Sequence, residues 1–193
     1  MIHLAVLGST RGTDLQPIID QIEKGALDAK IEIVISNKKE AYILERAQKY
    51  NLKNAFIDSN GKSREQYDAE VLEELKKYQI DLILLIGYMR ILSPVLVKEY
   101  KDKILNVHPS LLPAFAGGMD KNVHEEVLKS GVKETGCTIH LVDEGVDTGK
   151  ILLQKKCSIE SDETIETLKN KVQKLEGEAF IEVINNFINY EHN

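Results

Sequence analysis

Short apolar segments alternate with amphipathic helical patterns along most of the chain, and this alternation restricts the fold more than any other feature. The runs Ile2–Leu7, Ile31–Ile35 and Ile80–Ile86 are predominantly apolar, as expected of strands covered on both faces. Each is followed by a turn and a helical pattern, which is the order of β-α-β units. The sequence therefore predicts an α/β fold: an open, mostly parallel, twisted sheet of about seven strands with helices on both faces.

The later part of the chain predicts the rest of the sheet and a long helix. Ile104–Val107 is a further predicted strand. Thr135–Val142 and Ile151–Cys157 also read as strands, and their short connector predicts that they pair antiparallel. From about Thr164 to Phe187, apolar residues recur at spacings of three and four, which predicts a long amphipathic helix.

Capping signals mark the start of two helices. Ser63 and Gln66 fit a capping box before a helix predicted over Arg64–Tyr78. Asp14 is expected at the N-cap of a helix over Leu15–Lys24. Both signals support the predicted alternation of strands and helices.

Composition and charge narrow the range of partners. We expect a single domain over residues 1–193, a length that suits one core. The net charge of −6 argues against nucleic-acid binding but permits a phosphorylated small molecule. No segment is apolar enough to predict a membrane span, and Met1–Leu7 is too short for a signal sequence. Cys137 and Cys157 lack metal spacing and are expected to be free thiols, which suits a reducing cytoplasm.

A polar motif follows the predicted strand at Ile104–Val107. Asn106 and His108 are two residues apart, so their side chains project to the same side of an extended segment. Asp147 lies further on, in an acidic segment. Asn, His and Asp side chains can polarise a carbonyl, donate to an oxyanion and hold the donor in place. Taken singly, each of these residues is at least as consistent with a structural role in a turn.

Three other loops allow both a binding role and a structural one. Gly8–Asp14 opens a helix and could hold a phosphate with its N–H groups and the Thr13 hydroxyl, although it lacks the glycine spacing of dinucleotide-binding and Walker loops. Gly87–Leu92 could form an apolar slot for a flat heterocycle. Asp143–Asp147 could be a tight acidic turn with its glycine at a special backbone angle. His140 is expected to be a core histidine, and no residue cluster has metal spacing, so we expect no metal.

In combination, these motifs are much more specific than any one of them. The chain reads Asn-Val-His-Pro-Ser-Leu-Leu-Pro from Asn106 and Thr-Gly-Cys-Thr-Ile-His-Leu-Val-Asp-Glu-Gly-Val-Asp-Thr-Gly from Thr135. With Gly87–Pro94, these segments resemble the folate-dependent formyltransferases, and the resemblance covers about residues 2–185. Within that family, the length is similar to the stand-alone catalytic domains that act on glycinamide ribonucleotide.

The resemblance implies a Rossmann-like domain that transfers the formyl group of 10-formyltetrahydrofolate, a co-substrate, to the amine of glycinamide ribonucleotide in purine biosynthesis. The implied catalytic residues are Asn106, His108 and Asp147. The implied folate contacts are Arg64, Met89, Arg90, Ile91, Leu92, Asn106, Asp143, Glu144, Gly145, Val146 and Asp147. The implied ribonucleotide contacts are Gly12, Thr13, Asp14, Gln173 and Glu176.

The resemblance also implies a phosphate-substrate side in the N-terminal half and a folate side in the C-terminal half, in a monomer or homodimer. Asp14 stands where many relatives carry Asn, which leaves its contact with the substrate open. Two other functions stay open: formyl transfer to a different amine, such as an amino-sugar nucleotide, and folate binding without catalysis. Generic dinucleotide binding is disfavoured because the glycine fingerprint is absent.

Overall fold

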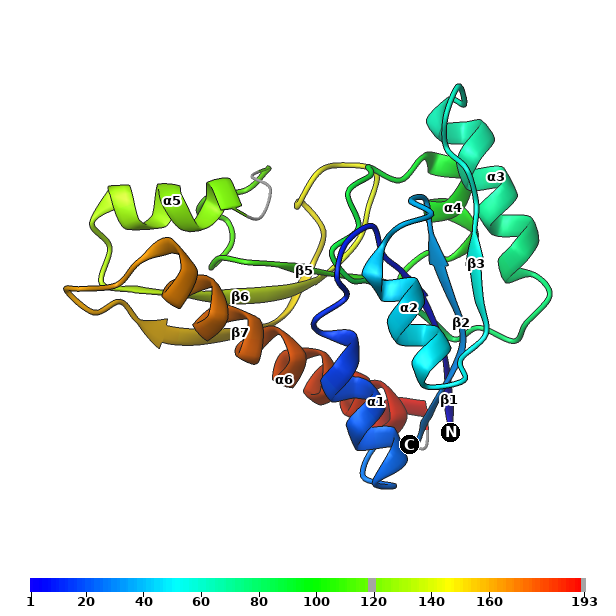
Figure 1. The fold of residues 1–193 in the computed structure, drawn as a ribbon, viewed down its shortest axis with the longest axis horizontal. Helices are drawn as coiled ribbons and strands as arrows, with labels where there is room; N and C mark the ends of the chain where they lie inside the picture. The colour runs from blue at the N-terminus through cyan, green and yellow to red at the C-terminus, as the bar shows by residue number, and fades with distance from the viewer. Residues whose placement is uncertain (118–120, 192–193) are drawn as a thin grey trace.

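The structure, a computed structural model, describes residues 1–117 and 121–191. Within these ranges, seven strands form one sheet, and six helices accompany it (Figure 1). The strands are β1 (Ile2–Leu7), β2 (Ala29–Ser36), β3 (Asn54–Phe56), β4 (Leu82–Leu85), β5 (Ile104–His108), β6 (Glu134–Leu141) and β7 (Ile151–Ser158). The helices are α1 (Leu15–Glu23), α2 (Tyr42–Lys49), α3 (Arg64–Leu75), α4 (Pro94–Glu99), α5 (Lys121–Ser130) and α6 (Ile165–Glu191).

The strand order across the sheet is β3-β2-β1-β4-β5-β6-β7. The first five strands in the chain run parallel, β6 pairs antiparallel with β5, and β7 pairs antiparallel with β6. The predicted α/β fold and the predicted antiparallel pair are confirmed. The chain winds outward from β1 to β3 and then in the opposite direction from β4, so β1 and β4 flank a topological switch point. In open α/β sheets, ligands bind at the carboxyl ends of the strands near such a point.

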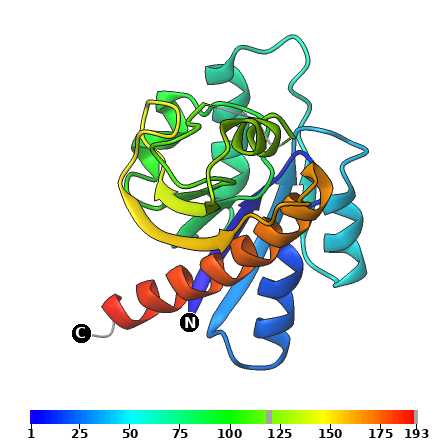
Figure 2. The ribbon, with the colours of Figure 1, turned by 90° about the vertical axis from the view of Figure 1, so that its left-hand side faces the viewer.

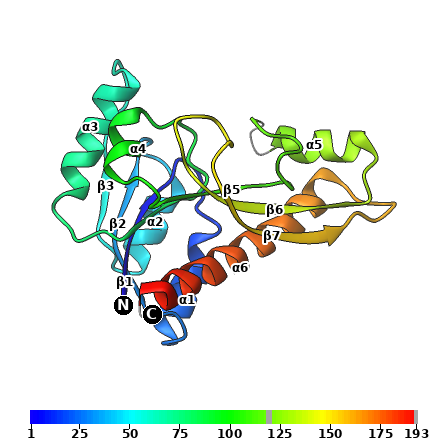
Figure 3. The same cartoon turned by 180° about the vertical axis from the view of Figure 1, so that it is seen from behind.

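Alternate residues of β1 face two separate cores, because successive strand side chains point to opposite sides. Leu4 and Val6 belong to the core that α1, α2 and α6 cover, whereas Ala5 and Leu7 belong to the core beneath α3 and α4. Figure 2 shows α6 running beside α1, and Figure 3 shows α3 next to α4. Burial on both faces explains why this strand reads as a continuous apolar run.

Helix α3 begins as predicted and ends earlier than predicted. The Ser63 hydroxyl accepts from the Gln66 N–H, and the Gln66 side chain accepts from the Ser63 N–H, so the predicted capping box is confirmed. The helix ends at Leu75 instead of Tyr78. The Lys77 and Tyr78 N–H groups bond to carbonyls three residues earlier, which is the tighter geometry common at helix ends.

The starts of α1 and α6 differ in detail from the sequence expectations. Asp14 occupies the N-cap position of α1, but its side chain makes no capping hydrogen bond and its backbone is already helical, with φ −74° and ψ −15°. Ile165 was expected in the buried stripe of the last helix, yet it is 39% exposed because it is the first residue of α6. Phe180 and Ile184 are fully buried on that helix instead.

The two cysteines are free thiols, as predicted. Cys137 is buried and Cys157 partly buried, and burial raises the pKa of both thiols. None of the helices described here is both long enough and apolar enough to cross a bilayer.

Gly136 marks a very close approach between β6 and β7. A Cβ at this position would lie 1.8 Å from the Lys155 carbonyl oxygen, so an alanine would push the two strands apart. We expect Gly136→Ala to lower the free energy of unfolding by about 1–3 kcal/mol, the usual cost of overpacking, measured by urea denaturation. Glu134→Ala, at an exposed position of the same strand, should change it by less than about 0.5 kcal/mol. Equally small effects of both substitutions would show that the strands have room to adjust.

Candidate active site

A cleft of about 990 Å³ opens at the carboxyl ends of β1, β4 and β5. The loops that follow these three strands line it, together with the segment between β6 and β7 and residues near the start of α6. The cleft therefore lies at the topological switch point, where open α/β sheets bind their ligands. It brings together segments that are more than 150 residues apart in the chain, since both Thr10 and Glu176 line it.

Asn106 and His140 face each other across the antiparallel β5–β6 pair. Asn106 Nδ2 lies 3.1 Å from His140 Nε2, and His140 Nδ1 lies 2.8 Å from the Leu141 carbonyl oxygen. A carbonyl only accepts, so Nδ1 carries the proton and Nε2 accepts from the Asn106 amide. This contact fixes one amide hydrogen of Asn106 and leaves the other for the cleft, which Asn106 lines.

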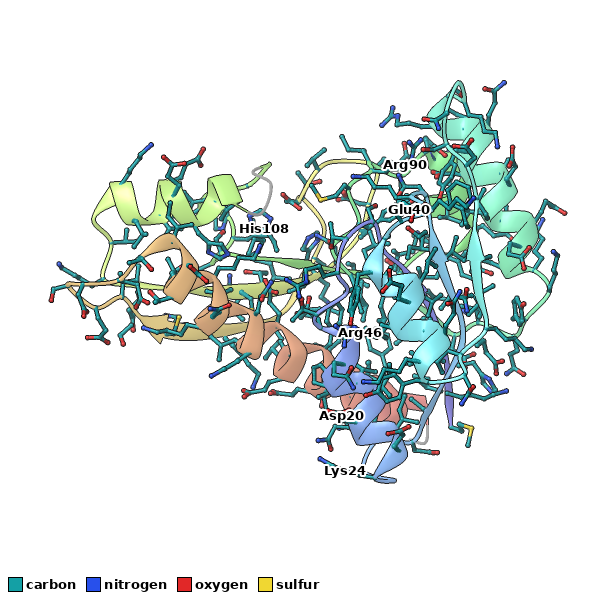
Figure 4. All side chains as sticks on the ribbon, in the orientation of Figure 1. Asp20, Lys24, Glu40, Arg46, Arg90 and His108 are labelled. Atoms are coloured by element: carbon teal, nitrogen blue, oxygen red, sulfur yellow. The ribbon has the colours of Figure 1, made fainter. Side chains whose placement is uncertain are left out.

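His108, at the end of β5, is 3% exposed and lies between two acceptors (Figure 4). Its Nδ1 lies 3.2 Å from Asp147 Oδ2, and its Nε2 lies 2.9 Å from the Phe115 carbonyl oxygen. Two acceptors favour the doubly protonated imidazolium, in which both nitrogens donate. Burial acts against the charge and lowers the pKa of His108 below its ordinary value, while the Asp147 carboxylate acts in the opposite direction.

Asp147 is held by its backbone conformation and by several neighbours. Its φ is +55°, a left-handed conformation that a non-glycine residue keeps only where the surrounding structure imposes it. Oδ2 accepts from the Gly117 N–H at 2.8 Å, and Oδ1 lies 3.5 Å from His140 Nε2. Burial alone would raise the pKa of this carboxyl, but the His140 ring, the Gly117 N–H and the His108 ring outweigh burial and lower the pKa.

Hydrogen bonds shape the loop that leads to Asp147. Asp143 Oδ1 accepts from the Gly145 N–H at 2.9 Å and from the Thr148 hydroxyl at 2.7 Å. The left-handed conformation expected at the glycine is found at Asp147 instead. Gly145 is required for a different reason, because a Cβ there would lie 2.1 Å from Thr148 Oγ1.

Apolar side chains line one end of the cleft. Met89, Ile91 and Leu92 come from the loop after β4, and Val146 comes from the loop before Asp147. Ile91 is 43% exposed and Val146 46% exposed. Exposed apolar groups on two facing loops suit a flat, mostly apolar ligand, because binding removes their surface from water.

Two neighbouring residues of α3 hold the loop after β4. The Ser93 N–H donates to the carboxylate of Asp68, which is 1% exposed. Burial raises the pKa of Asp68, although the hydrogen bond from Ser93 acts against this. The Arg90 guanidinium lies 4.4 Å from the Tyr67 ring centroid, a cation–π distance. The apolar end of the cleft therefore rests on a loop fixed from outside.

The loop after β1 forms the other end of the cleft. Gly12 has φ +62°, and a Cβ there would lie 2.4 Å from the Ile43 side chain, so the turn passes tightly over α2. Polar and charged residues line this end: Thr10, Arg11, Thr13, Asp14, Arg46, Lys169, Gln173 and Glu176. This end therefore differs in chemistry from the apolar end.

Nearly all of the predicted site residues line this one cleft, and Arg64 and Glu144 are the two that do not. Arg64 is the exposed first residue of α3. The Glu144 carboxylate lies 3.8 Å from the Lys98 ammonium. Their contacts with folate, like the roles of the residues inside the cleft, stay predictions.

The sequence reading missed three groups of the site. His140 is 2% exposed, as a core histidine would be, but it also lines the cleft and contacts Asn106. Knowledge of the β5–β6 register would have placed it there. Phe115 contributes a backbone carbonyl, which no side-chain pattern predicts, and Arg46 reads as an ordinary helix-surface residue. In the described ranges, no three His, Cys, Asp or Glu side chains are arranged to hold a metal ion.

Comparisons with known proteins agree with this geometry. The model of the formyl transferase family matches residues 2–184. The chain belongs to the formyl transferase family. It is 40% identical over 185 residues to the phosphoribosylglycinamide formyltransferase of Haemophilus influenzae, covering 95% of this chain and 86% of that protein.

Other members of the family give the same result. Glycinamide ribonucleotide transformylase 1 from Symbiobacterium toebii superposes with a TM-score of 0.90 at 38% identity, over 95% of this chain and 86% of that one. The trifunctional purine biosynthetic protein adenosine-3 of Gallus gallus is 41% identical over 180 residues. That match covers 93% of this chain, and the chain spans only 18% of the length of that relative.

The Asp147 carboxylate should control the charge of His108. We expect Asp147→Asn to lower the pKa of His108 further, because the substitution removes the negative charge that favours the imidazolium and leaves burial unopposed. NMR titration of the His108 ring measures this shift. Glu144→Gln, which removes an exposed charge from the same loop, should leave the pKa of His108 nearly unchanged. An unchanged or higher pKa in Asp147→Asn would mean that the pair does not interact as described.

Proposed function

We propose that this formyl transferase moves the formyl group of 10-formyltetrahydrofolate to the amine of glycinamide ribonucleotide, releasing tetrahydrofolate, in purine biosynthesis. The convergence of Asn106, His108 and Asp147 in one cleft carries the proposal. The printed names of relatives that match nearly the whole chain support the choice of acceptor. We also propose that residues 1–193 act as one catalytic domain.

The two ends of the cleft suit the two substrates. The apolar end around Ile91 and Val146 suits the flat pteridine ring of the folate. The polar end around Thr13 suits a phosphorylated ribose. With these assignments, each end draws on both halves of the chain, because Ile91 comes from the N-terminal half and Gln173 from the C-terminal half. This differs from the phosphate half and folate half that the resemblance implied.

Asn106 can stabilise the charge that develops during transfer. The folate co-substrate supplies the formyl carbonyl, and attack by the substrate amine places negative charge on the formyl oxygen. Asn106 can donate its second amide N–H to that oxygen, since the first is bonded to His140. A donor fixed in place before the reaction needs little reorganisation, which makes its contribution large.

His108 and Asp147 can supply positive charge and move a proton. As an imidazolium, His108 would be a charge-assisted donor next to the formyl oxygen. In the described arrangement its Nε2 bonds to the Phe115 carbonyl, so His108 donates to a substrate either after that carbonyl moves or from Nδ1, which it shares with Asp147. Asp147 can also order a water that carries a proton from the attacking amine to the leaving N10.

A panel of acceptors tests this function. The purified chain is mixed with a 10-formyl folate analogue whose loss of the formyl group changes its absorbance, and with glycinamide ribonucleotide, an amino-sugar nucleotide or no acceptor. We expect turnover only with glycinamide ribonucleotide, and a loss of about 10²–10⁴-fold in His108→Ala.

The other outcomes of the panel are equally informative. Turnover with the amino-sugar nucleotide alone would assign a different acceptor to the same chemistry. Binding of the folate analogue without turnover on any acceptor would favour a folate-binding module and contradict the proposal. Undiminished turnover in His108→Ala would place the reaction elsewhere in the molecule.

A further inference from the structure

Two arginines flank one tyrosine at the polar end of the cleft. Arg11 and Arg46 both line the cleft with Thr13. The Arg11 and Arg46 guanidinium carbons lie 6.0 and 5.5 Å from the centroid of the Tyr42 ring, within the range of cation–π attraction. In a chain whose net charge is −6, this is a local concentration of positive charge at the mouth of a cleft.

Uncharged groups hold the Arg46 side chain in place. Its Nη1 donates to Gln16 Oε1. Gln16 cannot turn its amide, because its Nε2 donates to Asp20 Oδ1 at 2.7 Å and to the Tyr50 hydroxyl at 2.8 Å. Arg46, which Figure 4 shows between α1 and α2, is thus oriented from both helices without neutralisation of its charge.

The Arg46 guanidinium also has a donor in reserve. Its Nε atom is buried and has no hydrogen-bond partner within the described part of the chain. A buried donor without a partner is costly, and a ligand at this end of the cleft would satisfy it. Guanidinium donors match the oxygens of a phosphate in two parallel bonds.

The charges around this end require such a cation. Three carboxylates, those of Asp14, Glu166 and Glu176, line the cleft here and would repel a phosphate dianion. Cations held close to the phosphate must offset that repulsion. Arg46 is suited to this because the groups that position it do not neutralise its charge.

We propose that Arg46, positioned by Gln16 and Tyr42 and assisted by Arg11, binds the phosphate of the ribonucleotide and makes the enzyme selective for the phosphorylated substrate. This inference rests on the proposed function. It assigns a specificity role to α2, a helix that contributes no residue to the reacting centre.

The test compares kcat/KM for glycinamide ribonucleotide and for its dephosphorylated riboside in four proteins. These are the wild type, Arg46→Met, Arg46→Lys and the control Lys49→Met. We expect Arg46→Met to lower kcat/KM for the ribonucleotide about 10- to 100-fold, through KM, and to leave the riboside unchanged. Arg46→Lys should recover part of the loss, because lysine keeps the charge without the planar fork.

Lys49→Met is the matched control, since Lys49 lies on the same helix, contacts the Tyr50 ring at 5.5 Å and does not line the cleft. It should retain the wild-type preference for the ribonucleotide. An equal loss on both substrates in Arg46→Met, or an unchanged preference, would overturn the inference while the proposed function stands. Failure of the wild type to formylate the ribonucleotide would instead refute the proposed function, and this inference with it.

Discussion

The carboxylate of Asp147 lies between the rings of His108 and His140, and the rest of the site is arranged around it. One oxygen is 3.2 Å from His108 Nδ1 and the other is 3.5 Å from His140 Nε2. His140 in turn accepts from Asn106. Four side chains from two strands and one loop therefore form a single polar network, and burial strengthens the coupling among them because water screens them little.

Strand pairing delivers these groups to one place. The β5–β6 register sets Asn106 opposite His140, and β5 extends to His108. The loop that follows β6 then returns Asp147 to the same end of the sheet, where its left-handed backbone turns the carboxylate toward both rings. The switch point between β1 and β4 adds the apolar and polar loops on either side. The cleft is thus a consequence of topology, and its chemistry comes from the strand ends.

Local patterns predicted the fold because they depend on neighbours in sequence. Apolar runs such as Ile2–Leu7 and the capping box at Ser63 need no knowledge of the tertiary structure. The meeting of Asn106 and His108 with Asp147 was predicted from motif and family resemblance. The contacts of His140 depend on strand register, and that of Phe115 on the path of a loop. Neither is encoded in local periodicity, so both became visible only in three dimensions.

The central claim is that His108 and Asp147 act as one unit in formyl transfer, and a double-mutant cycle tests it most directly. The turnover number with glycinamide ribonucleotide is measured for His108→Ala, Asp147→Ala and the double variant. Residues that act as a unit give grossly non-additive losses, so the double variant should lose about as much as the worse of the two single variants. Losses that multiply in the double variant would contradict the account, because they would show that the imidazole and the carboxylate contribute independently.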